Sequence, residues 1–415
     1  MGKPGFPIPL RKGCALPHPP AGGGVGEPGS PIFTLEGLCG MLPSRAEPSP
    51  PSPSPAEEGN PAPPPAGGRL GGGRQVIPLW LGTLRLPLLT LAGALALTTL
   101  ALLSTGVSPL QAYRILIFGA FSSPSRFSDM IMLAAPLLLC ATGLTLTFRS
   151  GLYNLGVEGQ LALGAVAAML PLRLLPDLPA PLLWTLCFAC AAGGGALWAL
   201  LAAGLRLYAG VSEIFAGLGL NFLASGLALY LVLGPWRRSG SASMSGTELL
   251  PRDLWLPTIG TLRLAPLAPI VALAALAVVW WVLRQTRWGL ELRAVGLNAE
   301  AAERLGVPAY RRIAQAMAAC GLLAGMAGAI QILGVFHQLI PNISSGVGLL
   351  GLLATLLVRA DPRWVLPVSV VFASFTVGSV QLPLALGVDS SIAGVLQGAL
   401  VLFALLARGL VSKPG

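Results

Sequence analysis

From Leu79 onward, apolar windows of about 17 to 25 residues recur along the chain with only short breaks between them. An α-helix needs about this length to cross the hydrocarbon core of a bilayer. The windows are continuously apolar, whereas the strands of a membrane barrel alternate apolar and polar residues over about ten positions. The chain is therefore predicted to be an all-α integral membrane protein with about ten transmembrane helices.

Each of these windows predicts one membrane span, and one of the windows is shorter than the others. The window at 347–358 is short enough to be a re-entrant segment. The predicted spans lie at residues 86–104, 128–148, 157–172, 181–205, 214–233, 264–283, 313–336, 347–358, 364–380 and 388–407.

The charge of the chain fits this class of protein. Only 10% of the residues are charged, and the formal net charge is +10. The basic residues are scattered over short connections and form no stripe interleaved with aromatic residues, so no nucleic-acid partner is expected. Arginine is enriched in cytoplasmic loops, and the arginine-richer connections define an inner side on which both termini lie, with contact to membrane lipid. The inner basic residues are Arg149, Arg206, the Arg284 to Arg312 cluster, Arg359, Arg363, Arg408 and Lys413.

Two regions differ sharply in composition. Residues 1–78 hold about half of the 38 prolines, with many glycines between them. Such a segment buries too little apolar area to offset its chain entropy, so a disordered Pro/Gly-rich N-terminal tail is predicted. Residues 79–415 then form the transmembrane domain.

One inner connection is unusually rich in charge. It reads TRWGLELRAVGLNAEAAERLGV from Thr286 to Val307. Asn298 can cap a short helix, Glu300 suits its positive N-terminal end, and Gly306 can adopt the left-handed conformation that stops it. Glu300 and Arg304 are spaced for an i,i+4 pair. This helix either docks into a partner through its alanines or belongs to an ordinary basic loop.

A second feature is the segment GLYNLGVEGQ, residues 151–160. Its three glycines disfavour a continuous helix and Asn154 is a natural cap, so at least one broken helix is expected here. Broken helices at membrane depth occur where they are buried in protein or line a cavity. Glu158 and Gln160 would then bond a polar ligand or brace neighbouring helices. The alternative is an inner interfacial turn with Glu158 paired to Arg149.

Three sequence blocks resemble permease subunits of bacterial ABC importers, in the branch for branched-chain amino acids, simple sugars and nucleosides. RWGLELRAVGLNAEAAERLGVP looks like the segment that contains the coupling helix, and SEIFAGLGLNFLASG, with Asn221, is a weaker match. TFRSGLYNLGVEGQLALGA is similar to the version found in the nucleoside type. The residues that this resemblance assigns to ATPase coupling are Arg293, Gly296, Asn298, Glu300, Ala301, Ala302, Arg304 and Gly306.

The resemblance implies a function and a set of partners. Residues 79–415 would be a permease domain in the bacterial inner (plasma) membrane that translocates a small polar solute, namely a nucleoside, with a simple sugar as the alternative. It implies a cytoplasmic ABC ATPase subunit, a second permease subunit and an extracellular substrate-binding lipoprotein. The candidate substrate-path residues are Asn154, Glu158, Gln160 and Asn221.

The residues argue against other classes. The lysines, Lys3, Lys12 and Lys413, follow no phosphate-binding glycine loop, so the chain is not expected to hydrolyse ATP. With only two histidines, neither a Ser/His dyad nor a metal site is expected, and no cofactor is implied. An ion-gradient secondary transporter is a rival, because four acidic residues lie near predicted span ends. They are Asp129, Glu158, Glu213 and Asp389.

Overall fold

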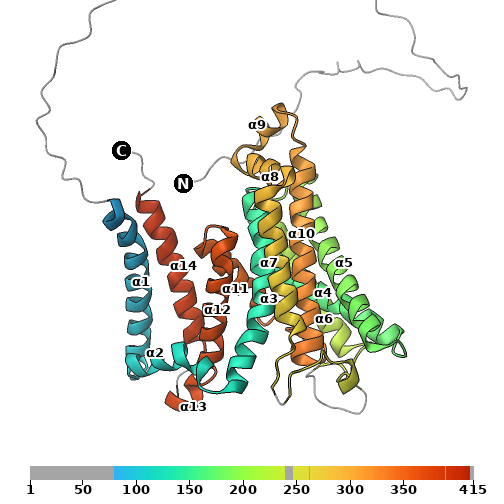
Figure 1. The fold of residues 1–415 in the computed structure, drawn as a ribbon, viewed down its shortest axis with the longest axis horizontal. Coiled ribbons are helices and arrows are strands. Elements are labelled where there is room, and N and C mark those ends of the chain that lie inside the picture. The colour runs from blue at the N-terminus through green and yellow to red at the C-terminus, as the bar shows by residue number, and fades with distance from the viewer. Residues whose placement is uncertain (1–78, 239–245, 261, 388, 412–415) are drawn as a thin grey trace, which may run out of the picture. The chain divides into compact units, whose positions relative to one another are not determined.

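The computed structural model describes residues 79–238, 246–260, 262–387 and 389–411 (Figure 1). Within these ranges the regular backbone is helical, apart from an isolated antiparallel bridge between Arg237 and Thr247. The predicted tail at 1–78 lies outside the described residues. For the described residues, the all-helical prediction is confirmed.

The helices follow one another in a single series. The first half contains α1 (Leu79–Ser104), α2 (Pro109–Phe118), η1 (Gly119–Phe121), α3 (Pro124–Arg149), α4 (Val157–Leu174), α5 (Ala180–Leu207) and α6 (Glu213–Leu233). The second half contains η2 (Arg252–Leu254), α7 (Leu267–Gln285), α8 (Arg287–Leu297), α9 (Ala299–Arg304), α10 (Ala309–Ile330), the π-helical turn η3 (Gln331–Phe336), α11 (Val347–Leu357), α12 (Pro362–Ser379), α13 (Leu382–Leu386) and α14 (Ile392–Val411).

Six described helices are long and apolar enough to cross a membrane, namely α3, α4, α5, α6, α7 and α10 with η3. The chain is therefore a multi-pass membrane protein. Each of the remaining predicted windows also falls on a helix, but α11 has only 11 residues, and α1 is followed by α2 across a bend of 119°. The count of ten spans stays a prediction.

The interior of the bundle consists of three helices. In α3, 78% of the best apolar window is buried, and in α4 and α10 the buried share is 67%. The corresponding share is 33% in α5 and α6 and 22% in α7, so these helices cover the interior and expose apolar side chains outward. In a membrane protein such outward faces contact lipid or another subunit.

Glycines set the spacing of the inner helices. A Cβ added at Gly325 of α10 would lie 2.0 Å from the Ala191 carbonyl oxygen of α5. A Cβ added at Gly195 of α5 would lie 2.1 Å from the Gly321 carbonyl oxygen of α10. A Cβ at Gly164 of α4 would lie 2.3 Å from the Gly325 Cα. The three backbones therefore touch directly, which is how helices without a hydrophobic drive pack in lipid.

Replacing Gly325 with alanine is expected to destabilise the bundle by at least about 2 kcal/mol, because the backbone of α5 cannot yield to a Cβ at this distance. The measurement is the thermal unfolding midpoint of the purified chain in detergent. Gly193→Ala is the matched control, since a Cβ at Gly193 would meet no atom within 4 Å. Equal midpoints for the two variants would contradict this view of the packing.

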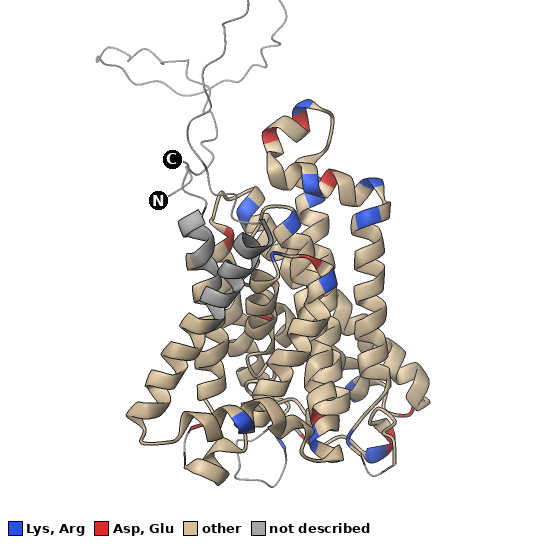
Figure 2. Cartoon of the chain, turned by 60° about the vertical axis from the view of Figure 1, so that its left-hand side comes forward, with Lys and Arg blue, Asp and Glu red and all other residues tan. Residues whose placement is uncertain are grey.

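The two ends of the bundle differ in their helices and charges. Figure 1 shows α8 and α9 at one end, called here the α9 end, where α1 also begins and α14 also ends. Figure 2 shows basic residues at both ends, with the larger group at the α9 end. At the other end, the described part of the loop between α6 and α7, called here the outer loop, packs on η3. Leu256 N–H donates to the Leu333 carbonyl at 3.1 Å, and Trp255 stacks on His337 just after η3.

Candidate functional site

The predicted break lies between α3 and α4. Residues 150–156 form no helix, and Gly151 has a φ of +83°, which a residue with a Cβ rarely adopts. Asn154, near the end of the break, is buried and contacts Cys320 in the middle of α10. The segment therefore runs from the α9 end, where Gly151 contacts Gly296 of α8, to the start of α4 inside the bundle.

Three amide side chains brace this break. Asn154 and Gln160 are both fully buried and exchange two hydrogen bonds of 3.1 Å, and the Asn154 oxygen also accepts from Gly156 N–H at 3.1 Å. On α6, the Asn221 oxygen accepts from Gly159 N–H and its amide donates to the Leu155 carbonyl, each at 2.8 Å. These three candidate substrate-path residues thus bond to protein groups.

Glu158 lies where two helices begin. It is the second residue of α4, and its Oε1 accepts a hydrogen bond of 2.8 Å from the N–H of Leu349 in the first turn of α11. Gly348 permits this approach, since a Cβ there would lie 3.2 Å from the Glu158 carboxyl carbon. Helix N-termini carry partial positive charge, so both helices stabilise the carboxylate.

The other carboxylate oxygen, Oε2, is buried and has no hydrogen-bond partner among the described residues. The alternative pairing of Glu158 with Arg149 is not formed. The Arg149 Nε instead donates to the Ala360 carbonyl at 3.1 Å. Glu158 thus differs from the other three candidate substrate-path residues, because its Oε2 accepts no hydrogen bond from the described residues.

The predicted short helix is α9. Its N-cap is Asn298, whose side chain accepts from Ala301 N–H at 3.0 Å, and Gly306 has a φ of +83° just after the helix ends. Glu300 and Arg304 form the expected ion pair at 2.6 Å. Both side chains are largely exposed, so this pair contributes at most about 0.5 kcal/mol.

The two alanines assigned to one docking face point in different directions. Ala302 is 2% exposed and packs with Val295 and Ala309, whereas Ala301 is exposed. Leu297 and Leu305, which flank α9, are 89% and 83% exposed. Ala301 therefore faces outward on a helix with an exposed leucine at each end and an exposed ion pair beside it, while Ala302 holds α9 to α8 and α10.

Helix α8 connects α9 to the break. Arg293 donates to the Leu283 carbonyl at 2.7 Å, which fixes α8 to the end of α7. Gly296 packs directly on the chain at the end of α3, since a Cβ there would lie 2.1 Å from the Arg149 carbonyl oxygen and 3.2 Å from Gly151 N. A displacement of α9 would reach the break through this contact.

A valine at Gly296 should break this connection without touching the exposed face of α9. The resemblance found in the sequence implies solute uptake driven by an ATPase, and we expect that uptake to fall at least about tenfold, because the new side chain forces α8 away from residues 149–151. The measurement is the initial uptake rate, and co-purification of the implied ATPase should persist. The matched control is Gly204→Val, where a Cβ would meet no atom within 4 Å, and equal uptake by the two variants would count against the link.

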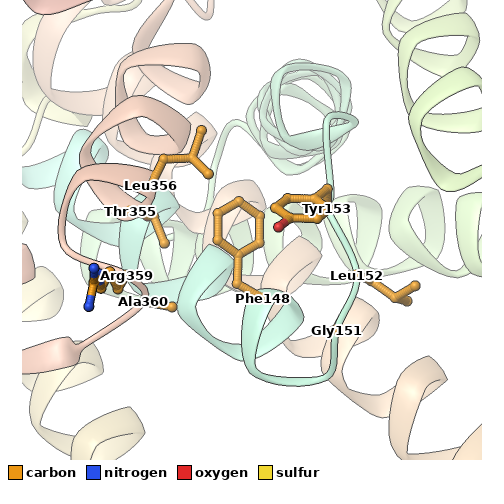
Figure 3. Close-up of a pocket in the computed structure, with 8 residues that line it drawn as sticks. All are labelled: Phe148, Gly151, Leu152, Tyr153, Thr355, Leu356, Arg359 and Ala360. Carbon is orange, nitrogen blue, oxygen red and sulfur yellow. The ribbon is translucent and has the colours of Figure 1, made fainter. Parts of the chain in front are cut away.

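A pocket of about 260 Å³ opens beside the break. Its walls come from the end of α3, the break and the end of α11, and Figure 3 shows the rings of Phe148 and Tyr153 next to each other, with Arg359 on the far side. The lining residues are Phe148, Gly151, Leu152, Tyr153, Thr355, Leu356, Arg359 and Ala360. Gly151 therefore joins the pocket to the Gly296 contact.

The sequence did not indicate three parts of this site. The meeting of Glu158 with α11, the Gly296 contact and the pocket each join residues from distant parts of the chain. The glycines Gly296 and Gly348 were the available signals, but their contacts depend on the fold. Among the described residues, no three His, Cys, Asp or Glu side chains gather closely enough to hold a metal ion.

Comparison with known proteins gives consistent matches. Residues 126–405 match the model of the family described as branched-chain amino acid transport system / permease component. The chain is 31% identical to the glucose ABC transporter permease protein TsgB13 of Haloferax volcanii, over 80% of this chain and 89% of that one. It is 28% identical to the guanosine ABC transporter permease protein NupP of Bacillus subtilis, over 78% and 93%. The nucleoside ABC transporter permease protein NupB of Lactococcus lactis is 24% identical, over 71% and 83%.

Proposed function

This chain belongs to the family of permease components of branched-chain amino acid transport systems, and we propose that it carries a nucleoside inward past Glu158 as the membrane subunit of an ATP-driven importer. The observation that carries the proposal is the contact of Gly296 with residues 149–151. It joins the exposed helix α9 to the break at which α4 begins. The family match and the named relatives confirm the resemblance to ABC importer permeases that the sequence shows.

The proposal assigns separate tasks to the predicted residues. Ala301, with the exposed leucines beside it, receives the ATPase subunit, while Ala302 and Arg293 hold α9 and α8 in place. The asparagine cap, the Glu300 to Arg304 pair and Gly306 shape α9 itself. Gly296 transmits the movement of α8 to the break.

The path residues also divide into two kinds. Asn154, Gln160 and Asn221 brace the break, because their hydrogen bonds are already made within the protein. Glu158 keeps a free acceptor oxygen, which suits the hydroxyl donors of a ribose. Alternating access would then move the first turns of α4 and α11 relative to each other.

Orientation and partners follow from the same proposal. The α9 end carries the larger group of basic residues, which favours its placement on the cytoplasmic side of the inner membrane, with both termini there. The cytoplasmic ATPase would bind at α9. A second permease subunit would complete the path, and an external lipoprotein would deliver the solute.

A simple sugar is the second candidate, because the relative at 31% identity is named a glucose permease. Both kinds of solute carry ring hydroxyls that suit a carboxylate acceptor. The two relatives named for guanosine and nucleosides favour the nucleoside.

Uptake of radiolabelled guanosine and glucose by cells with and without the gene tests the proposed function. Guanosine uptake should require the gene and should be reduced by excess unlabelled nucleoside, with glucose uptake unaffected. Loss of glucose uptake alone on deletion would replace the nucleoside with the sugar. If neither uptake changes, the proposed function is wrong.

A further inference from the structure

The pocket beside the break has an unusual lining for a transport protein that carries hydroxylated solutes. None of its eight lining residues has a carboxylate or an amide side chain. A sugar ring needs several such hydrogen-bonding groups around it to replace water. The pocket is therefore poorly suited to a sugar.

The polar groups that the lining does offer are few. The Thr355 hydroxyl lies 3.1 Å from the Ala141 carbonyl and 2.8 Å from the Gly351 carbonyl, so its hydrogen is already used. The phenol of Tyr153 and the guanidinium of Arg359 remain as groups that can meet a ligand at the pocket.

Two aromatic side chains also line the pocket. Phe148 and Tyr153 lie with ring centroids 5.1 Å apart at an interplanar angle of 61°, an edge-on arrangement. Tyr153 is 51% exposed. Because an edge-on pair leaves ring surface uncovered, a further planar group can stack there, and stacking on an aromatic side chain is a common way to hold a nucleobase.

The position of the pocket gives this stacking a role. It lies beside the part of the break that faces the α9 end, and Gly151 in its wall contacts Gly296 of α8. A movement of α8 would therefore change the pocket as well as the break. A solute that has passed Glu158 toward the α9 end would meet this pocket on leaving the bundle.

We infer that the pocket is an exit site that holds the planar base of the cargo by stacking on Tyr153, with the hydroxylated ring left to water. This inference rests on the proposed function and narrows it, since the exit site favours nucleosides over free sugars. Arg359 can donate hydrogen bonds to the ring nitrogens and carbonyl oxygens of the base.

The test is photolabelling of the full chain in lipid nanodiscs with 8-azidoguanosine, followed by mapping of the labelled peptides. Label is expected on peptides that contain residues 148–153 or 355–360. Unlabelled guanosine should compete for the label and glucose should not.

Substitutions at Tyr153 make the test specific. Tyr153→Ala should reduce labelling at least about fivefold, and Tyr153→Phe should retain it, because the ring and not the hydroxyl provides the stacking. Tyr153→Leu keeps apolar volume without a ring, so it should lose the label as well. The matched control is Tyr208→Ala at the end of α5, where the side chain is 91% exposed, and it should label like the natural chain.

Several results would overturn the inference. They are an absence of label on the natural chain, label confined to other peptides, undiminished label in Tyr153→Ala or Tyr153→Leu, and equal competition by glucose. Guanosine uptake by cells separates this inference from the proposed function. If uptake depends on the gene but labelling does not depend on Tyr153, the exit site alone is wrong. If the chain supports no nucleoside uptake, the proposed function is wrong.

Discussion

A chain with Ala301→Trp is expected to insert and fold normally and yet to lose at least about nine-tenths of its ATP-driven uptake, an effect of the size seen when a central interface position is blocked. Ala301 is exposed on α9, so an indole there meets no group of its own chain and projects toward the partner. The measurement is uptake rate, with co-purification of the ATPase subunit as the second readout. Both should fall together.

Two further substitutions show why Ala301 must be changed alone. Ala301→Ser adds only a small side chain to this surface, so this variant should transport normally. Ala302→Leu should instead lower the unfolding midpoint, because Ala302 packs against Val295 and Ala309 and overfilling such a site costs about 1–3 kcal/mol. An Ala301→Trp chain that keeps its ATPase and its uptake would contradict the docking role of α9.

Replacing Glu158 with glutamine is expected to reduce nucleoside uptake about ten- to a hundredfold while the protein remains folded. Glutamine can still accept from Leu349 N–H through its oxygen, so the contact between α4 and α11 survives. The second oxygen becomes an NH₂ group, which cannot accept a hydroxyl donor. Hydrogen bonds to charged groups contribute about 1.5–3 kcal/mol, which corresponds to this loss.

The control for this variant is Glu248→Gln in the outer loop, an exposed carboxylate remote from the break. It should transport normally. The unfolding midpoint of Glu158→Gln should match that of the natural chain, and ATPase co-purification should persist. Unchanged uptake in Glu158→Gln would exclude the carboxylate from the path, and a large loss of thermal stability would make Glu158 a structural residue instead.

Local features of this protein could be predicted because their causes are local. The helices at 128–148 and 181–205 follow from the unbroken apolar length of these segments. A segment of this kind in a bilayer must satisfy its backbone hydrogen bonds internally, and a helix does so. The cap at Asn298 and the stop at Gly306 need only neighbouring atoms. The break at 151–156 follows from the glycines and the asparagine within it.

Other features depend on contacts between distant segments and could not be predicted. Ala301 and Ala302 are chemically identical, and only the packing of α9 on α8 and α10 buries one of them. Asn154 and Gln160 are candidates for the solute path, and Gln160 was also expected as a brace, but only the fold shows that their amides bond to each other. The free acceptor of Glu158 is visible only once the first turn of α11 is brought beside α4.

The most direct test of the account is solute accumulation by proteoliposomes that contain the full chain with its partner subunits, with or without the ATPase. ATP is supplied on the side of α9, and an ion gradient is imposed in parallel samples. We expect guanosine to accumulate only when both the ATPase subunit and ATP are present. Accumulation by the chain without the ATPase, driven by the ion gradient, would contradict the account and make the protein a secondary transporter.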